Sequence, residues 1–311
     1  MGKLAFLFPG QGAQVVGMGK DFFDTYDLAK KRFAEADEAL GYSISKLCFE
    51  GPADQLQLTE HTQPAILTVA VIASELLRAE GIAPEIAAGH SLGEYAALVA
   101  AGVLSFQDAV LLVHKRGAYM QEAVPVGEGA MAAVIGLDDE TIIAVCAEAS
   151  TVGAGQAVNF NCPGQTVIAG TAKGVEHAVT LLQEKGAKKA VILPVSAPFH
   201  STLMEPAAKK LAAELDKVEL HDAAFPVVSN YTGGLQQTAA EIKANLVAQA
   251  DHPVRWIACV GAMRDFGADT YVECGPGKTL AGFNKRIDKE LKSLNVENVE
   301  SLQKTLDTLK K

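Results

Sequence analysis

The chain has 311 residues, of which 49% are hydrophobic and 21% charged, and it carries a formal net charge of −10. This composition is typical of a globular protein with a large core, or with a main domain and an inserted one. The acidic balance argues against nucleic-acid binding, and any anionic substrate or acidic partner needs a local basic patch. No apolar run is long enough to cross a bilayer, and residues 4–8 are too short for a signal-peptide core, so we expect a cytoplasmic protein without membrane contacts.

The cysteines indicate a reducing environment. They are odd in number and widely scattered, with no Cys-x-x-Cys pair: Cys48, Cys146, Cys162, Cys259 and Cys274. Such a pattern predicts neither a disulfide framework nor a zinc site. We therefore expect reduced cysteines buried in the core.

The first 126 residues alternate between strand and helix patterns. A short apolar run at residues 3–8 predicts a buried strand, and a turn-rich loop follows at residues 9–14. The further elements expected here are a helix over 21–40, a helix over 62–79, a strand over 84–88, a helix over 92–101 and a helix over 105–122. This order is that of a parallel sheet layered with helices, and so of an α/β protein.

The pattern changes from about residue 127. The elements expected next are a strand over 130–135, a helix over 139–148, strands over 157–160 and 166–170, a helix over 174–185 and a strand over 189–193. This β-α-β-β-α-β order is that of a ferredoxin-like unit. We predict that residues 127–196 form a small domain inserted into a large α/β domain, which is made of residues 1–126 and 197–311.

The signals of the large domain resume after the insertion. The expected elements are a helix over 206–217, a strand over 226–229, helices near 239–250 and 254–266, and a strand over 270–273. The lysine-rich end of the chain, residues 285–311, is expected to be helical and solvated.

The segment Gly89-His90-Ser91-Leu92-Gly93 lies between a predicted strand and a predicted helix. In that context Gly-x-Ser-x-Gly forms a sharp turn that exposes the serine hydroxyl, and the glycines leave room where the backbone bends. A chance match is the alternative in a chain rich in glycine and alanine. Both flanks fit the turn, so we interpret Ser91 as a nucleophile.

A serine hydroxyl needs a base, most often a histidine. His90 is expected to line the pocket, and five other histidines lie in predicted helices or beside turns: His61, His114, His177, His221 and His252. His200 differs because it follows the strand at 189–193, in a loop where Pro198 keeps the preceding residue out of helical geometry. Loops at strand ends are where sites assemble in open α/β sheets, so His200 is the predicted base, with a loop-packing histidine as the alternative.

Arg116 lies on the apolar stripe of its predicted helix, with Leu112 and Met120 one turn away and no carboxylate within a turn. A guanidinium facing the core needs an anion, and its planar fork fits a carboxylate. That anion is either a distant Asp or Glu or the carboxylate of a substrate in the serine pocket.

Five segments, in order along the chain, resemble malonyl-CoA:acyl-carrier-protein transacylases, the loading enzymes of type II fatty acid synthesis. They are Gly10-Gln11-Gly12-Ala13-Gln14, Gly89-His90-Ser91-Leu92-Gly93-Glu94, Arg116, Pro198-Phe199-His200 and Gly275-Pro276-Gly277. The resemblance spans essentially the whole chain. It implies an α/β-hydrolase-like large domain with a parallel sheet and an inserted ferredoxin-like small domain.

The resemblance also implies roles for single residues. Ser91 is the acylated nucleophile, His200 its general base and acid, and Arg116 the holder of the malonyl carboxylate. A backbone carbonyl, matched here by Gln249, orients the histidine in place of an acid. Backbone N–H groups of Gln11 and Leu92 form the oxyanion hole.

Asn161 corresponds to a position that faces the cleft from the small domain, although its place before Pro163-Gly164 is also that of a turn former.

The implied reaction moves a malonyl group from malonyl-CoA to the phosphopantetheine thiol of acyl carrier protein, without a metal or bound cofactor and in a cytoplasmic monomer. An acidic carrier would dock on a basic surface, for which two groups are candidates: Lys185, Lys188 and Lys189, or Lys285 and Arg286. Both are equally explained as solvated faces. A serine thioesterase or esterase and a non-catalytic carrier-binding module remain as alternatives.

Overall fold

The computed structural model describes residues 2–195 and 197–310, and it contains two separate β-sheets. The larger sheet has the strand order β10-β9-β1-β2-β7-β8, in which β8 pairs antiparallel with β7 and the other neighbours are parallel. Its strands are β1 (Lys3–Phe8), β2 (Ile86–Gly89), β7 (Val227–Val228), β8 (Leu235–Gln236), β9 (Ala268–Cys274) and β10 (Lys292–Val296). The predicted α/β class, with a mainly parallel sheet, is therefore confirmed.

Strand β1 lies in the middle of this sheet and is covered on both faces. Phe6 and Phe8 pack into one apolar cluster with helices α5 (Thr59–Ala79), α6 (Gly93–Ala100) and α7 (Phe106–Glu122). Ala5 and Leu7 pack into a second cluster with α12 (Trp256–Asp265) and α13 (Thr279–Ile287). The alternation follows from the two-residue period of a strand, and burial on both faces explains why the strand is continuously apolar.

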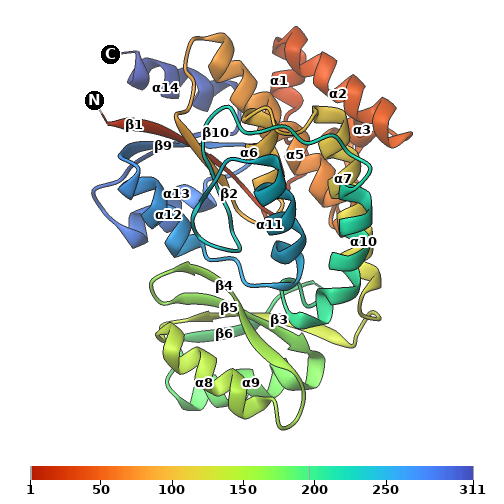
Figure 1. Ribbon diagram of the computed structural model, residues 1–311, viewed down its shortest axis with the longest axis vertical. Coiled ribbons are helices and arrows are strands. Elements are labelled where there is room, and N and C mark those ends of the chain that lie inside the picture. Colours follow the sequence, from red (N-terminus) through yellow and green to blue (C-terminus); the bar gives the residue numbers. More distant parts are fainter. Residues whose placement is uncertain (1, 196, 311) are drawn as a thin grey trace.

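Helices flank the large sheet on both sides (Figure 1). Before the small sheet they are α1 (Lys20–Thr25), α2 (Asp27–Leu40), α3 (Ile44–Glu50), α4 (Ala53–Leu56), α5 (Thr59–Ala79), α6 (Gly93–Ala100) and α7 (Phe106–Glu122). After it they are the short helix η1 (Thr202–Met204), α10 (Glu205–Leu215), α11 (Ala239–Asp251), α12 (Trp256–Asp265), α13 (Thr279–Ile287) and α14 (Val299–Leu309).

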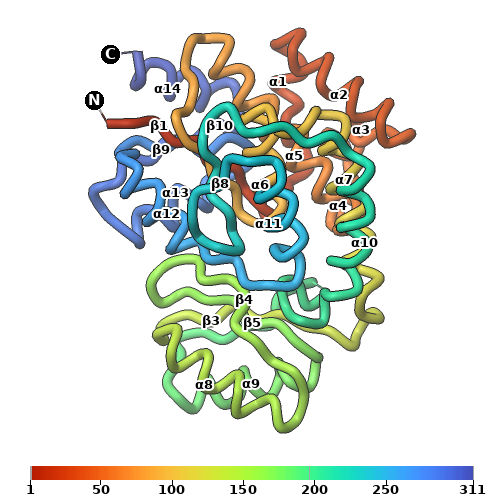
Figure 2. The backbone as a smooth tube through the Cα atoms, in the orientation of Figure 1, coloured from red at the N-terminus to blue at the C-terminus, as the bar shows by residue number. Residues whose placement is uncertain are grey.

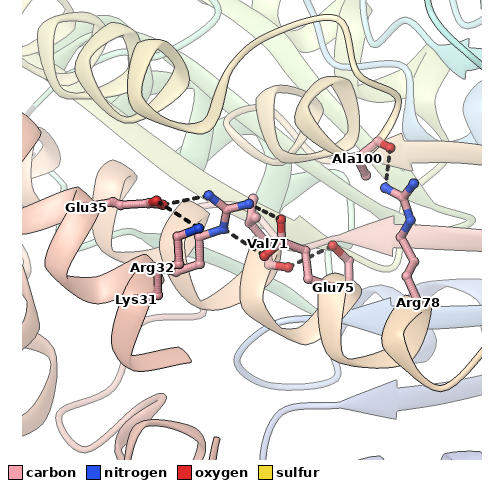
Figure 3. A network of polar contacts seen from close by, with 8 residues as sticks. Lys31, Arg32, Glu35, Val71, Glu75, Arg78 and Ala100 are labelled. Carbon is pink, nitrogen blue, oxygen red and sulfur yellow. Dashed lines mark hydrogen bonds and ion pairs between the residues drawn. The ribbon is translucent and has the colours of Figure 1, made fainter. Parts of the chain in front are cut away.

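A half-buried ionic network fastens α2 to α5 (Figure 3). Arg32 on α2 donates to both carboxylate oxygens of Glu75 on α5, at 2.8 and 2.5 Å, and to Glu35 at 2.6 Å. One turn further along α5, Arg78 donates to the carbonyl oxygen of Ala100 at the end of α6, at 3.0 Å. Bidentate geometry in a network gives such pairs more weight than an isolated surface ion pair. The network holds α2 and α6 against α5, the helix that also carries Gln63 of the site described below.

The smaller sheet is antiparallel, with the order β4-β5-β3-β6. Its elements follow one another as β3 (Gly129–Ile135), α8 (Asp139–Ala149), β4 (Gly155–Cys162), β5 (Gln165–Thr171), α9 (Ala172–Glu184) and β6 (Lys189–Ile192). The predicted order of strands and helices in this segment is therefore observed. Figure 2 traces how the chain leaves the larger body after α7, builds this sheet and returns toward α10.

The two faces of the small sheet contact different partners. Ala130, Ala132 and Val134 of β3 pack against α8 and α9, whereas Met131 joins a cluster with Met120 of α7 on the opposite face. That opposite face is turned toward the larger sheet, so residues from both sheets enclose the space between them (Figure 1).

Several sequence expectations are corrected by the structure. The helix expected over 21–40 is interrupted at Tyr26, whose extended backbone separates α1 from α2, and α2 starts with the acidic Asp27 in its first turn. The end of the chain is not one helix, because β10 pairs in parallel with β9 between α13 and α14. The sequence pattern of β10 is weak, because Val296 is the one fully buried residue of that strand.

The helix expected over 254–266 begins at Trp256, because Val254 exchanges backbone hydrogen bonds with β4. Ser196, at the predicted domain boundary, and Lys311, at the end of the predicted large domain, lie outside the described residues. The five cysteines are free and buried, as expected. Within residues 2–195 and 197–310, none of the helices combines the length and apolar character of a membrane span.

Candidate active site

A cavity of about 240 Å³ lies between the two sheets, where β1 and β2 end. Gln11, Ser91 and Arg116 line it from the larger sheet and its helices, and Met131, Asn161 and Val167 line it from the smaller sheet. Space beyond the carboxyl ends of parallel strands is the usual place for ligands in open α/β folds.

Ser91 stands on a tight turn between β2 and α6, as predicted. Its φ angle is +53°, a region that residues other than glycine rarely adopt. A Cβ atom on Gly89 would overlap the backbone of Gly93, and a Cβ atom on Gly93 would overlap the carbonyl oxygen of Phe8. The two glycines are therefore required for the turn to pack against β1.

His200 is placed beside Ser91 although 109 residues separate them in sequence. Its Nε2 atom lies 2.7 Å from Ser91 Oγ, and its Nδ1 atom lies 2.8 Å from the backbone carbonyl oxygen of Gln249. A carbonyl oxygen only accepts, so Nδ1 carries the proton and the neutral ring offers Nε2 as the acceptor of the serine proton. His200 also has a positive φ, +63°, and it shares that feature with Ser91 alone among the described non-glycine residues.

The protonation state of His200 follows from its surroundings. Its side chain is 3% exposed. Burial and, secondly, the positive charge of Arg116 lower the pKa of His200 from 6.5 to about 3. At neutral pH the imidazole is therefore uncharged and able to accept a proton.

Arg116 is buried beside the serine, with 2% of its surface exposed. Its Nη1 atom donates to Gln63 Oε1 at 2.8 Å, and its Nη2 atom donates to Gln249 Oε1 at 2.9 Å and to Ser91 Oγ at 3.1 Å. All three acceptors are neutral, and no carboxylate of the described residues forms an ion pair with it. Burial lowers the pKa of Arg116. Of the two anions expected from the sequence, the distant Asp or Glu is therefore not in direct contact.

The two backbone N–H groups expected to receive an oxyanion, those of Gln11 and Leu92, donate to no other described residue. Gln11 follows β1 and lines the cavity, and Leu92 follows Ser91 on the turn. Free amides beside a serine hydroxyl are what an oxyanion hole requires.

Asn161 lies on β4 and faces the cavity rather than only forming a turn. His90 Nε2 donates to Asn161 Oδ1 at 2.8 Å, so this side chain connects the serine turn to the smaller sheet. Phe199, next to the histidine, also lines the cavity.

Sequence reasoning missed the side chains that hold the serine turn. Asn230 Oδ1 accepts from Ser91 N at 2.6 Å, and Asn230 Nδ2 donates to Gly89 O at 2.7 Å. Gln249 was expected to act through its backbone, yet its side chain also donates to Ser91 O at 3.0 Å. Asn230 follows a strand of only two residues, and no local pattern distinguishes it from an ordinary turn residue.

Known proteins resemble this chain over nearly its whole length. The family described as "Acyl transferase domain" matches residues 5–306. A relative from Bacillus subtilis (strain 168), named malonyl CoA-acyl carrier protein transacylase, is 49% identical over 100% of this chain and 98% of its own length. The crystal structure of an acyl-carrier-protein S-malonyltransferase from Burkholderia pseudomallei 1710b has a TM-score of 0.96 and 50% identity, and the match covers 98% of this chain and 99% of that one.

A third similar structure is a complex, of a type II PKS acyl-carrier protein with its malonyl-transacylase. Its TM-score is 0.96 at 43% identity, covering 98% of this chain and 99% of that chain.

Proposed function

Because this chain belongs to the acyl transferase domain family, we propose that it moves a malonyl group from coenzyme A to the phosphopantetheine thiol of acyl carrier protein. One observation carries the proposal: Ser91 Oγ lies 2.7 Å from a neutral imidazole and 3.1 Å from a guanidinium without a carboxylate partner. The first contact supplies a nucleophile, and the second supplies a site for the carboxylate that distinguishes malonyl from acetyl groups.

In the first half of the reaction, His200 Nε2 accepts the proton of Ser91 while Oγ bonds to the thioester carbonyl carbon. The resulting oxyanion is stabilised by the amides of Gln11 and Leu92. The carbon–sulfur bond then breaks, and the coenzyme A thiolate leaves with the proton from His200. A malonyl-serine ester remains.

The second half reverses the first with a different thiol. The phosphopantetheine thiol gives its proton to His200, its sulfur attacks the ester, and Ser91 leaves with the proton restored. Holding the incoming thiol in line with the ester raises its effective concentration, which offsets up to about 7–11 kcal/mol of barrier in favourable cases. The chain and its two substrates supply every group, and we propose no metal or bound cofactor.

Two side chains bear on the choice of acyl group. Arg116 binds the malonyl carboxylate through its planar fork, for which a lysine is no substitute. Phe199, beside the base, crowds the α-carbon and disfavours branched acyl groups. Equal turnover of methylmalonyl-CoA would contradict the second assignment.

The finer description of the fold belongs to the same proposal. Residues 1–126 and 197–311 form an α/β-hydrolase-like domain, and residues 127–196 form an inserted ferredoxin-like domain, which the strand order β4-β5-β3-β6 supports. The protein works as a monomer in the cytoplasm, and five free cysteines are consistent with a reducing compartment.

Mass spectrometry of the intact protein tests the transfer. After mixing with malonyl-CoA, we expect a lasting malonyl adduct that is absent from Ser91→Ala and that disappears when the phosphopantetheinylated carrier protein is added and gains the same mass. Free malonate without an adduct would instead show a thioesterase, and no release of coenzyme A would show a binding module.

A further inference from the structure

Glu94 is a buried carboxylate that the proposed transfer does not use. It lies in the first turn of α6, three residues after the nucleophile, and is 0% exposed. Burial raises its pKa, whereas hydrogen bonds from three donors and the charge of Arg116 oppose that rise. Burial alone favours the neutral acid, but every hydrogen-bond partner of the two Glu94 oxygens is a donor, which is the arrangement that an ionised carboxylate requires.

The contacts of Glu94 lead directly to the site. Its Oε2 atom accepts from the backbone N–H of Asn230 at 3.0 Å and from Gln249 Nε2 at 2.8 Å, and its Oε1 atom accepts from Gln236 Nε2 at 2.6 Å. The Gln249 amide cannot be turned around, because its Oε1 atom accepts from Arg116, which only donates. One amide group therefore bridges the carboxylate and the guanidinium.

The remaining neighbours of Arg116 carry no negative charge. Gln63 and Ser91 are neutral acceptors, and the ring of Tyr95 lies 5.6 Å from the guanidinium carbon. Burial raises the pKa of Tyr95 to about 12, so at neutral pH it offers a ring face and not a charge. Among the described carboxylates, Glu94 is the one that a single side chain, that of Gln249, joins to Arg116.

We propose that Glu94 is a positioning residue whose carboxylate is the counter-charge of Arg116, transmitted across the Gln249 side chain. A carboxylate in direct contact would occupy the guanidinium fork. Across an amide, it stabilises the buried charge without forming an ion pair, and the guanidinium keeps neutral acceptors only, Gln63, Gln249 and Ser91. This inference rests on the proposed function, in which that guanidinium receives the malonyl carboxylate.

Binding of free malonate tests how the charge of Glu94 changes the affinity of the Arg116 site for a carboxylate. Glu94→Gln keeps the shape and the acceptor facing Gln249 but removes the charge. We expect malonate, measured by calorimetry, to bind on the order of tenfold more tightly, because the guanidinium loses its counter-charge in a site of low dielectric. Gln236→Leu is the matched control: it removes one donor and keeps the carboxylate, so binding should change less than about threefold. Weaker or unchanged binding to Glu94→Gln would overturn the proposal.

A second measurement does not depend on substrate. We compare the urea midpoints of unfolding of Glu94→Gln, Arg116→Met and the double variant with that of the parent. Each single variant leaves one buried charge uncompensated, and the double variant leaves none, so its midpoint should lie above the value expected from adding the two single shifts. Additive shifts, or a double variant that does not fold, would overturn the counter-charge assignment. The intact-mass experiment on malonyl loading of Ser91 in the parent protein tests the proposed function independently of these unfolding measurements.

Discussion

The two residues of the proposed nucleophile–base pair both have unusual backbone conformations. Ser91 and His200 have φ angles of +53° and +63°. Such conformations cost about 1–3 kcal/mol each and persist where the surrounding structure enforces them. Here Asn230 holds the backbone on both sides of the turn, through Ser91 N and Gly89 O. The strain directs a hydroxyl and an imidazole, remote in sequence, toward each other.

In the proposed function Arg116 has two effects, since it would bind the malonyl carboxylate and its charge lowers the pKa of the neighbouring His200. Its charge is the second cause, after burial, of the low pKa of His200. When a malonyl carboxylate neutralises that charge, the pKa of His200 should rise, and the base should become stronger only after the correct acyl group has bound.

We therefore predict that Arg116→Met raises the pKa of His200 by about one unit or more, because the variant removes the charge and keeps an apolar side chain at the site. NMR titration of the histidine ring protons measures this value, and His200→Ala assigns the resonance. An unchanged or lower pKa in Arg116→Met would show that the guanidinium does not act on the base.

At the scale of elements, the site depends on how closely α6 approaches the end of β1. Gly93 opens α6, and a Cβ atom there would lie 2.8 Å from the carbonyl oxygen of Pro9, in addition to overlapping Phe8. Backbone atoms cannot move aside as a flexible side chain can. The start of α6, and with it the Ser91 turn, is fixed by this contact.

Gly93→Ala should accordingly reduce the rate of Ser91 acylation at least about a hundredfold and lower the free energy of unfolding by about 2–4 kcal/mol. The matched control is Gly261→Ala in α12, where an added Cβ meets nothing within 4 Å. That change should leave acylation intact and raise stability by about 0.5–1 kcal/mol, because alanine favours a helix interior. Urea denaturation and intact-mass kinetics measure both variants, and equal behaviour of the two would contradict the role of the close approach.

Elements with a strong local pattern could be predicted from the sequence, and the weakly patterned ones could not. The bounds of β1 agree residue for residue, since its continuous apolar run matches a strand buried on both faces. The helix expected over 105–122 has Ser105 as its N-cap, whose Oγ atom accepts from Asp108 N at 3.1 Å. The strand β10 and the break at Tyr26 were missed, because the pairing of β10 with β9 is a long-range contact that local periodicity does not encode.

The candidate site shows the same limit. Ser91, His200 and Arg116 were found because a motif, a loop position and an apolar stripe each single them out. The roles of Asn230 and Glu94 were missed, because the contacts that join Asn230 to Glu94 and to the Ser91 turn span 136 or more residues of the chain. Buried polar groups must be satisfied, but only the folded chain shows which groups meet.

For the molecule as a whole, the cavity exists because the two sheets are held at a fixed separation. Val254 donates to Val158 O at 2.8 Å and accepts from Phe160 N at 3.0 Å, which attaches β4 to the start of α12. The connection between β4 and β5 is held as well, because Arg286 of α13 donates to Pro163 O at 3.0 Å. Arg286, which the sequence left open as a docking residue, is therefore hydrogen-bonded within the chain. These contacts keep the wall formed by the small sheet in place over Ser91.

Glu273 is a second buried acid, and its ionisation bears on the free energy of unfolding of the whole protein. Glu273, near the end of β9, joins that strand to the start of α13, because its carboxylate accepts from Leu280 N at 3.1 Å and from Ala281 N at 2.9 Å. It is 0% exposed, and burial raises its pKa from 4.5 to about 7 although the backbone donors oppose the rise. Leu280 in turn lines the cavity, so the ionisation of Glu273 bears on a wall of the site.

The pH dependence of unfolding should reveal this group. The folded pKa of Glu273 is raised, so its contribution to stability is fully present below pH 4.5 and is lost as the pH rises through 7, a total change of about 3 kcal/mol. The side chain of Glu273→Gln cannot ionise. The free energy of unfolding of the parent minus that of the variant should therefore fall by about 3 kcal/mol between pH 4.5 and 8. A constant effect of the new amide on stability does not change this pH dependence. The contribution of His200 is common to both proteins and cancels.

Glu300→Gln serves as the control: Lys304 lowers the pKa of that exposed acid, so the corresponding difference in the free energy of unfolding should rise with pH. Urea titrations at several pH values measure these differences, and a constant difference for Glu273→Gln would show that this carboxyl group titrates in the fold as it does in the unfolded chain.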